Sequence, residues 1–265
     1  MSASLLFLFI IIYFGILLGV AKIAGKNSNN MSFFIGNKNS NWMLVAFGMI
    51  GTSLSGVTFV SVPGAVSKDA FHYLQITIGY LIGYFTIAYV LLPIYYKLNL
   101  TSIYHYLEQR LGFNAYKTGA SFFVLSRTLG ATARLYLVVK ILQVFILDSL
   151  GVPFWATTLV ILIMILLYTY EGGVKTIVWT DTLQTSGMLM GLIICSIYIL
   201  SNLHLSVAEG LQAMQLKGIA TVFNTDVNSK SFFLKQIIGG AFITLTMTGL
   251  DQEMMQKNIS VKTLK

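Results

Sequence analysis

Residues 50–56 of the chain read I-G-T-S-L-S-G. The stretch lies inside an apolar run from residue 42 to residue 63, which is long enough to cross a lipid bilayer. An ordinary membrane helix does not require three hydroxyl side chains and two glycines near its centre. One explanation is close contact with a neighbouring helix, because small residues let two backbones approach. The other is a helix that unwinds in mid-membrane, where its freed carbonyl oxygens hold a cation.

The composition of the whole chain indicates an integral membrane protein. Of its 265 residues, 56% are hydrophobic and 10% are charged, whereas about a quarter of the residues in a soluble globular chain are charged. The net charge of +8 is scattered between apolar runs, which is typical of loops that orient a membrane protein. A nucleic-acid partner is therefore not expected. The single cysteine, Cys195, cannot form an internal disulfide.

Seven apolar runs are predicted to be membrane-spanning helices. Helices are expected because a lipid-exposed backbone must satisfy its own hydrogen bonds, and the runs do not alternate as barrel strands do. The first run lacks a basic leader and an obvious cleavage site, which predicts a retained helix. The third contains Gly79-x-x-x-Gly83, a pattern that favours close helix packing. The runs are residues 4–21, 41–65, 73–96, 117–147, 154–170, 180–202 and 231–250.

The loop charges predict how the chain is oriented. The loops at 22–40 and 97–117 each carry three lysine or arginine residues. They alternate with the poorly basic loops at 66–72, 148–153 and 203–230. Because basic loops tend to stay in the cytoplasm, the N-terminus is predicted to lie outside.

A second hydroxyl-rich stretch, I-T-L-T-M-T-G at residues 243–249, is similar to the first. Both begin with isoleucine and end with a hydroxyl residue followed by glycine. The two spans that hold them are expected to run in opposite directions, because five spans separate their starting points. A pair of interrupted helices in opposite orientation is typical of inverted-repeat transporters.

Two arginines lie within the fourth predicted span. Arg127 and Arg134 are seven residues apart and share one helix face. Arg127 falls about 15 Å along the helix, near mid-membrane. Arginine at such depth usually lines a polar interior, where it can bind a carboxylate through two parallel hydrogen bonds. Arg127 is therefore a predicted anion ligand, with structural pairing or snorkelling as the alternative. Lys140 is predicted to snorkel.

Five segments carry a resemblance to a known family. They are FFIGNKNSNW (33–42), SLSGVTFVSVPGAV (53–66), LPIYYKLNLTSIYHYLEQRLG (92–112), YEGGVKTIVWTDTLQ (170–184) and TGLDQEMMQK (248–257). The fourth, with its Gly-Gly, Trp-Thr-Asp and Gln pattern, is the most specific. Together they resemble the sodium:solute symporter family, which includes sodium-coupled carriers of glucose, proline, sialic acid and iodide.

The resemblance implies an all-α polytopic membrane protein with a leucine-transporter-like inverted-repeat fold. Residues 1–21 would form a leading transmembrane helix, and residues 41–202 the first five-helix repeat. Residues 231–265 would form the first helix of the second repeat and a cytoplasmic end. Because family members are usually much longer, the fold is expected to be incomplete and the chain to be an N-terminal portion that holds half of the sodium site.

The resemblance also implies positions for ligands. The backbone carbonyls of Gly51 and Leu54 match the positions that hold the coupling sodium ion. Glucose-type carriers have aromatic side chains where this chain has Met247 and Thr248, which argues against a stacked sugar. In sialic-acid carriers a helix-three arginine binds the carboxylate, and Arg127 is the candidate for that position. The expected substrate-binding residues are Ser53, Ser55, Thr58, Phe59, Arg127, Thr244, Met247 and Thr248.

The predicted function is secondary active transport and not enzymatic catalysis, since the spans contain no His, Glu, Asp and Cys constellation. We expect sodium-coupled symport of a small polar or anionic solute by alternating access, in the plasma (inner) membrane. The expected partners are sodium, the solute and the bilayer, and no cofactor is expected beyond the coupling ion. The alternatives are a symporter-like sensor module of a longer signalling protein and a nonfunctional fragment.

Overall fold

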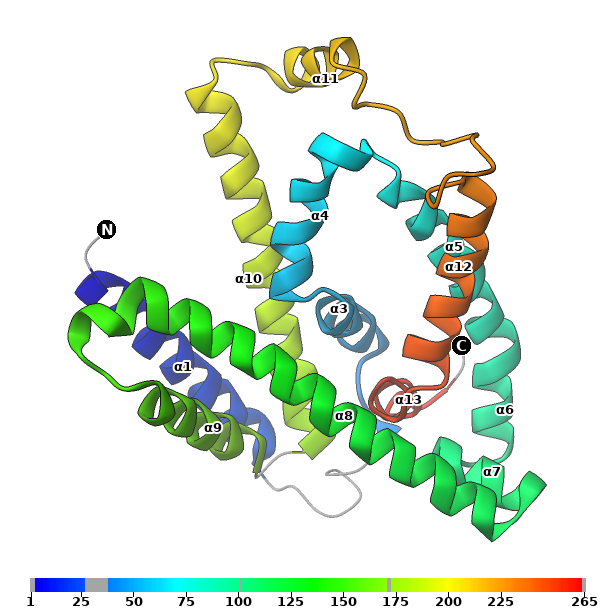
Figure 1. Ribbon diagram of the computed structural model, residues 1–265. Helices are drawn as coiled ribbons and strands as arrows, with labels where there is room; N and C mark the ends of the chain where they lie inside the picture. Colours follow the sequence, from blue (N-terminus) through cyan, green and yellow to red (C-terminus); the bar gives the residue numbers. More distant parts are fainter. Residues whose placement is uncertain (1–2, 27–37, 101, 171–172, 264–265) are drawn as a thin grey trace. The chain divides into compact units, whose positions relative to one another are not determined.

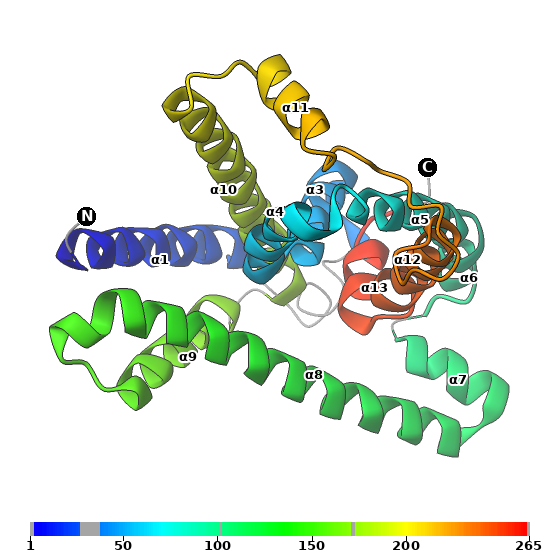
Figure 2. The ribbon, with the colours of Figure 1, turned by 45° about the horizontal axis from the view of Figure 1, so that its top comes forward.

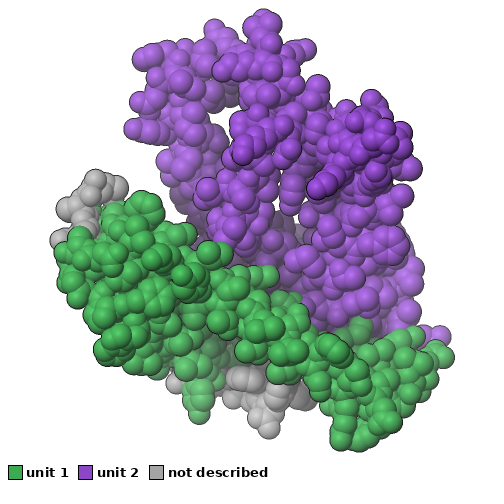
Figure 3. Space-filling model, viewed as in Figure 1, with its two compact units in different colours: residues 1–40, 100–180 green, residues 41–99, 181–265 purple. Residues whose placement is uncertain are grey.

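The computed structural model of the protein describes residues 3–26, 38–100, 102–170 and 173–263. Residues 33–37 of the expected lead-in to the second span lie outside the described residues, as do Glu171 and Gly172 of the Gly-Gly segment. The chain divides into two compact units (Figure 3). Unit 1 comprises residues 1–40 and 100–180, and unit 2 comprises residues 41–99 and 181–265.

Unit 1 is an assembly of apolar helices. The helix α1 (Ala3–Gly25) lies against α9 (Phe154–Tyr170), and α7 (Ile103–Leu111) lies against the long helix α8 (Phe113–Leu142). Helices α1 and α9 have no apolar stripe because they are apolar all round, as expected for helices in lipid. The end of α8 widens into the π-helical turn η3 (Gln143–Leu147), which also contacts α1.

Unit 2 contains both hydroxyl-rich stretches. Helix α10 (Gly173–Asn202) begins in unit 1 and continues in unit 2 from Asp181 onward. The other elements of unit 2 are α3 (Trp42–Ser53), α4 (Gly56–Asp69), α5 (Tyr73–Thr86), η2 (Ile87–Leu91), α6 (Leu92–Lys97), α11 (Val207–Leu216), α12 (Phe233–Thr244), η5 (Leu245–Gly249) and α13 (Gln252–Ile259) (Figure 1).

The predicted spans coincide with helices. Within the described residues, four continuous helices are long and apolar enough to cross a membrane, and two bent helix pairs bring the number to six. The remaining predicted span, residues 154–170, corresponds to α9, a shorter apolar helix. Helix α11 lies in the segment that was expected to be a loop. Its signal was present in the sequence as Ser206-x-x-Glu209, which forms a capping box.

Helices α5 and α12 run side by side in the same direction, as two views of the ribbon show (Figures 1 and 2). Gly79 faces Gly240, and Gly83 faces Thr244 one turn further along both helices. The close packing predicted from Gly79-x-x-x-Gly83 is therefore confirmed. Because α5 reverses the direction of α4 and α12 is parallel to α5, the two interrupted spans run in opposite directions, as expected.

Candidate functional site

The first hydroxyl-rich stretch interrupts its helix. Helix α3 ends at Ser53 and α4 begins at Gly56, and the two axes differ by 62°. Leu54 (φ −80°, ψ 123°) and Ser55 (φ −106°, ψ 153°) between them are extended. The Ser55 hydroxyl caps α4 by accepting a hydrogen bond from the Thr58 backbone N–H at 3.2 Å. The predicted break is therefore confirmed, and its position lies inside I-G-T-S-L-S-G.

The break leaves backbone carbonyl groups without helical partners. The Leu54 N–H still donates to the carbonyl of Ile50 at 2.9 Å, which closes the last turn of α3. Within the described part of the chain, the carbonyl oxygens of Gly51 and Leu54 accept no hydrogen bond across the break. Unwound carbonyl groups of this kind coordinate sodium in broken-helix transporters. The two positions expected to hold the coupling ion are thus chemically suited to it, and their role stays a prediction.

Helix α10 lies directly against the end of α3. A Cβ atom at Gly51 would fall on the side chain of Thr185, so only glycine fits there without a shift. The hydroxyl of Thr182 donates to the carbonyl of Leu44 at 3.3 Å. Gly51, the second residue of this stretch, therefore has a packing role as well as a place in the last turn before the break.

A second break follows the second hydroxyl-rich stretch. Helix α12 continues through the π-helical turn η5, and α13 then departs at 67°. The break falls at Leu250 and Asp251, directly after residues 243–249. The Asp251 carboxylate caps α13 by accepting from the N–H groups of Glu253 at 3.0 Å and Met254 at 3.2 Å. The hydroxyl of Tyr95 donates to the carbonyl of Gly249.

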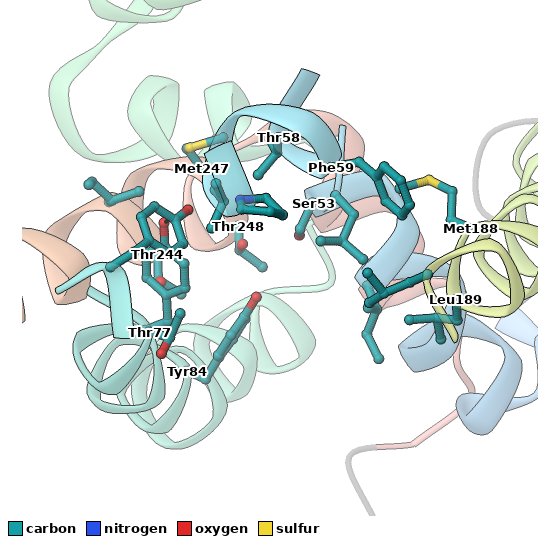
Figure 4. A pocket seen from close by; sticks show the side chains of 18 residues that line it. Ser53, Thr58, Phe59, Thr77, Tyr84, Met188, Leu189, Thr244, Met247 and Thr248 are labelled. Atoms are coloured by element: carbon teal, nitrogen blue, oxygen red, sulfur yellow. Dashed lines mark hydrogen bonds between the residues drawn. The ribbon is translucent and has the colours of Figure 1, made fainter. Parts of the chain in front are cut away.

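A pocket of about 580 Å³ lies within unit 2, beside the first break. Its walls come from α3, α4, α5, α10, α12 and η5. In Figure 4, Phe59 and Met188 lie on one side, Thr77 and Thr244 lie on the other, and Ser53 lies between them. Ser55 is not among the lining residues, and it acts instead as the cap of α4. The predicted substrate residues that line the pocket are Ser53, Thr58, Phe59, Thr244, Met247 and Thr248.

Four hydroxyl side chains of α5 form a wall of this pocket, and none of them is among the residues predicted from the sequence. Tyr73, Thr77, Tyr80 and Tyr84 are spaced by four, three and four residues, so they share one helix face. The hydroxyl oxygens of Tyr73 and Tyr80 are 3.4 Å apart. None of the described residues that line the pocket carries a charged side chain. The spacing was visible in the sequence, but only the fold shows that this face of α5 borders the pocket.

A buried lysine joins three helices next to the first break. The Lys257 ammonium lies 2.7 Å from Asp181 Oδ2, 2.9 Å from Thr52 Oγ1 and 2.9 Å from Glu253 Oε1. The hydroxyl of Thr52 is also within 3.1 Å of Asp181 Oδ2. Asp181 and Lys257 are 76 residues apart, and nothing local in the sequence indicates that they pair.

Arg127 lies on α8 in unit 1. Its guanidinium carbon is 5.7 Å from the centre of the Phe123 ring, and its side chain is half-buried. The ring of Tyr104 of α7 packs against the same ring at a tilt of 48°, with 5.6 Å between the ring centres. Burial raises the pKa of Tyr104, and the nearby charge of Arg127 acts in the opposite direction. The role of Arg127 as a substrate ligand stays a prediction, and Arg134 and Lys140 are exposed.

The sequence matches known proteins along most of its length. The model of the sodium:solute symporter family matches residues 33–265. The human sodium/iodide cotransporter is 26% identical over 263 residues, which cover 97% of this chain and 40% of that protein. The rabbit sodium-dependent multivitamin transporter is 28% identical over 83% of this chain and 34% of its own length. The mouse sodium-coupled monocarboxylate transporter 2 is 25% identical over 243 residues, which cover 91% of this chain and 38% of that protein.

The fold also matches a solved structure. A Na⁺-coupled sialic acid symporter, in a substrate-bound outward-open state, superposes with a TM-score of 0.83 at 22% sequence identity. The match covers 95% of this chain and 53% of the symporter chain. The chain therefore spans about half of that structure and about 40% of the human cotransporter. The predicted all-α membrane fold is confirmed, as part of the complete symporter fold.

Proposed function

The chain belongs to the sodium:solute symporter family, and from this premise we propose that the protein carrying it couples the entry of sodium to the uptake of a small polar or anionic solute. Sodium binds at the α3–α4 break, and the solute binds in the adjoining pocket. The two broken helices then move relative to the rest of the protein and open the site to the other side of the membrane. The relatives are named as transporters and cotransporters, which favours transport over the sensor alternative.

The observation that carries this proposal is the position of the break at the edge of the pocket. Leu54 itself lines the pocket, and Ser53 and Thr58 line it from either side of the break. A cation held by the carbonyls of Gly51 and Leu54 would fix the angle between α3 and α4. It would thereby order the pocket wall before the solute arrives, which lowers the entropic cost of solute binding. Sodium and solute binding are coupled in this way without a direct contact between them.

The pocket lining favours a solute that is neutral or carries a single negative charge. Eight lining residues carry hydroxyl groups, which can donate as well as accept hydrogen bonds, and none of the lining residues that the structure describes supplies a formal charge. Met188, Met247 and Phe59 add polarizable and apolar surface. The volume falls within the range of about 300–1,000 Å³ that is usual for small-molecule sites. Iodide and monocarboxylates, which the names of two relatives mention, have this character.

We extend the proposal to the membrane in which the protein lies and to the orientation of the chain in that membrane. We place the protein in the plasma (inner) membrane with its N-terminus outside. The loop at 97–117 is basic, whereas the loops before and after it, at 66–72 and 148–153, are poorly basic. Basic loops tend to stay in the cytoplasm. In this orientation the N-terminal ends of α5 and α12 lie near the outer surface. Site-directed labelling of single cysteines at Lys217 and Lys97 would test it. Lys217 should react from outside and Lys97 should not.

Transport assays test the proposal directly. The full protein would be reconstituted into liposomes and supplied with labelled iodide, a labelled monocarboxylate or labelled sialic acid. Uptake above equilibrium is expected for at least one solute when sodium is higher outside, and not when choline replaces sodium. Uptake that does not depend on the sodium gradient, or that depends on a proton gradient alone, would overturn the proposal of sodium coupling.

A further inference from the structure

Lys257 places a positive charge in a buried position next to the first break. Its side chain is 4% exposed, and three oxygen atoms surround the ammonium group at 2.7–2.9 Å. These oxygens belong to α3, α10 and α13. Burial of an ammonium group is unfavourable unless such partners replace the lost water. The contacts therefore define a built cation position, which a side chain of the protein itself fills.

The charge of Lys257 is balanced chiefly by Asp181. The Asp181 side chain is 18% exposed, whereas that of Glu253 is 46% exposed and is screened by solvent. Asp181 Oδ2 is also the atom nearest to the ammonium, at 2.7 Å. Asp181 and Lys257 thus form a nearly neutral buried pair, and the loss of either member leaves an uncompensated charge on the other.

This pair is linked by direct contacts to the residues that surround the Gly51 carbonyl, which is expected to bind sodium. Thr52, which contacts both charged groups, directly follows Gly51 in the last turn of α3. On α10, the hydroxyl of Thr185 donates to the carbonyl of Asp181 at 2.7 Å, and Thr185 contacts Gly51. Coulomb interactions over such distances are strong where little water screens them. The net charge of the pair therefore affects the binding of a cation at the break.

We propose that Lys257 is a built-in counter-cation that lowers the affinity of the α3–α4 break for sodium. This inference rests on the proposed function, because it concerns the ion that this function requires. The ammonium group cancels the attraction of the Asp181 carboxylate for sodium, so the ion is held loosely enough to leave once the site has opened. Without the ammonium, Asp181 attracts sodium to the break, and sodium binds more tightly and dissociates more slowly.

The test is the sodium dependence of thermal unfolding, measured on the full protein in detergent with choline chloride keeping the ionic strength constant. Lys257→Gln is expected to reach half of its sodium-induced stabilisation at about one tenth of the wild-type sodium concentration, which corresponds to about 1.4 kcal/mol. Lys257→Arg keeps the charge and should retain the wild-type value. Lys235→Gln is the matched control, because it removes an exposed positive charge from α12 and should change nothing.

The outcomes separate this inference from the proposed function. If the wild-type protein responds to sodium and Lys257→Gln has an equal or higher half-saturating concentration, the counter-cation role is wrong and sodium coupling stands. If sodium does not stabilise the wild-type protein at all, both proposals are overturned. Should Lys257→Gln fail to fold, Asp181→Asn takes its place. That variant leaves the ammonium uncompensated and should need about ten times more sodium, and an unchanged value would overturn the inference.

Discussion

Gly79 of α5 and Gly240 of α12 meet at a contact between two backbones. A Cβ atom on Gly79 would fall on the carbonyl of Ile237, and a Cβ atom on Gly240 would fall on the carbonyl of Ile76. Because α5 carries the hydroxyl face of the pocket and α12 leads into η5, this contact holds two walls of the pocket at a fixed distance. Main-chain atoms cannot rotate away as a side chain would, so a substitution must move a helix.

Gly240→Ala should therefore destabilise the protein. Overpacking of this kind costs about 1–3 kcal/mol, and we expect a lower thermal unfolding temperature together with a weaker affinity for the solute. Gly239→Ala is the matched control, because Gly239 is the preceding residue of the same helix and a Cβ there meets no atom within 4 Å. Equal unfolding temperatures for the two variants would contradict the close contact.

Gly51→Ala should weaken the response to sodium, although the carbonyl group itself is retained. The added methyl group would meet Thr185 and push α3 away from α10. We expect a several-fold higher sodium concentration for half-maximal uptake. The double variant Gly51→Ala/Thr185→Ala should recover part of the loss, because it removes the atoms that the new methyl group meets first.

Gly56→Ala is the control for this experiment. It changes a glycine on the other side of the break, where a Cβ meets no described atom within 4 Å. If Gly51→Ala and Gly56→Ala have the same sodium dependence as the wild type, the contact between α3 and α10 does not shape the sodium site.

Tyr84→Phe tests the hydroxyl face of α5. The hydroxyl of Tyr84 points into the pocket in Figure 4. Loss of a hydrogen bond to the solute should raise the KM for uptake by about tenfold, the change expected for about 1.4 kcal/mol. The maximal rate should change little if the hydroxyl binds the solute equally in the ground state and the transition state. Tyr89→Phe removes a hydroxyl from a side chain that is 77% exposed and should leave the KM unchanged. A KM for Tyr84→Phe that matches the wild type would remove this residue from the site.

Arg127→Ala tests the sequence-based prediction of an anion ligand. If Arg127 binds a carboxylate, uptake of a carboxylate solute should lose affinity by tenfold or more, since a charge-assisted pair contributes about 1.5–3 kcal/mol. Arg134→Ala is the control on the same helix, because Arg134 is exposed. Unchanged affinity in Arg127→Ala, with normal insertion into the membrane, would assign Arg127 a structural role beside Phe123 and Tyr104.

Local signals in the sequence predicted the helices and the first break. Within the described residues, the apolar runs located the four continuous helices and the two bent helix pairs that are long enough to cross a membrane, because the hydrophobic length of a helix must match the bilayer. The break at Leu54 and Ser55 follows from the glycines and hydroxyl residues around it, which tolerate an unwound backbone. The second break lies at Leu250 and Asp251, where the Asp251 side chain caps the start of α13.

The tertiary structure decided which side chains share the site. The tyrosines of α5 and the hydroxyl groups of the first break are brought together by helix contacts, and no periodicity specifies those contacts. The same holds for Lys257 and Asp181, whose pairing depends on how α13 lies against α3 and α10. Hydropathy and helix-breaking residues act over a few turns of one segment, so the sequence alone determined a membrane fold with an interrupted helix. The pocket and the charge pair arise from contacts between distant segments, so only the folded chain reveals them.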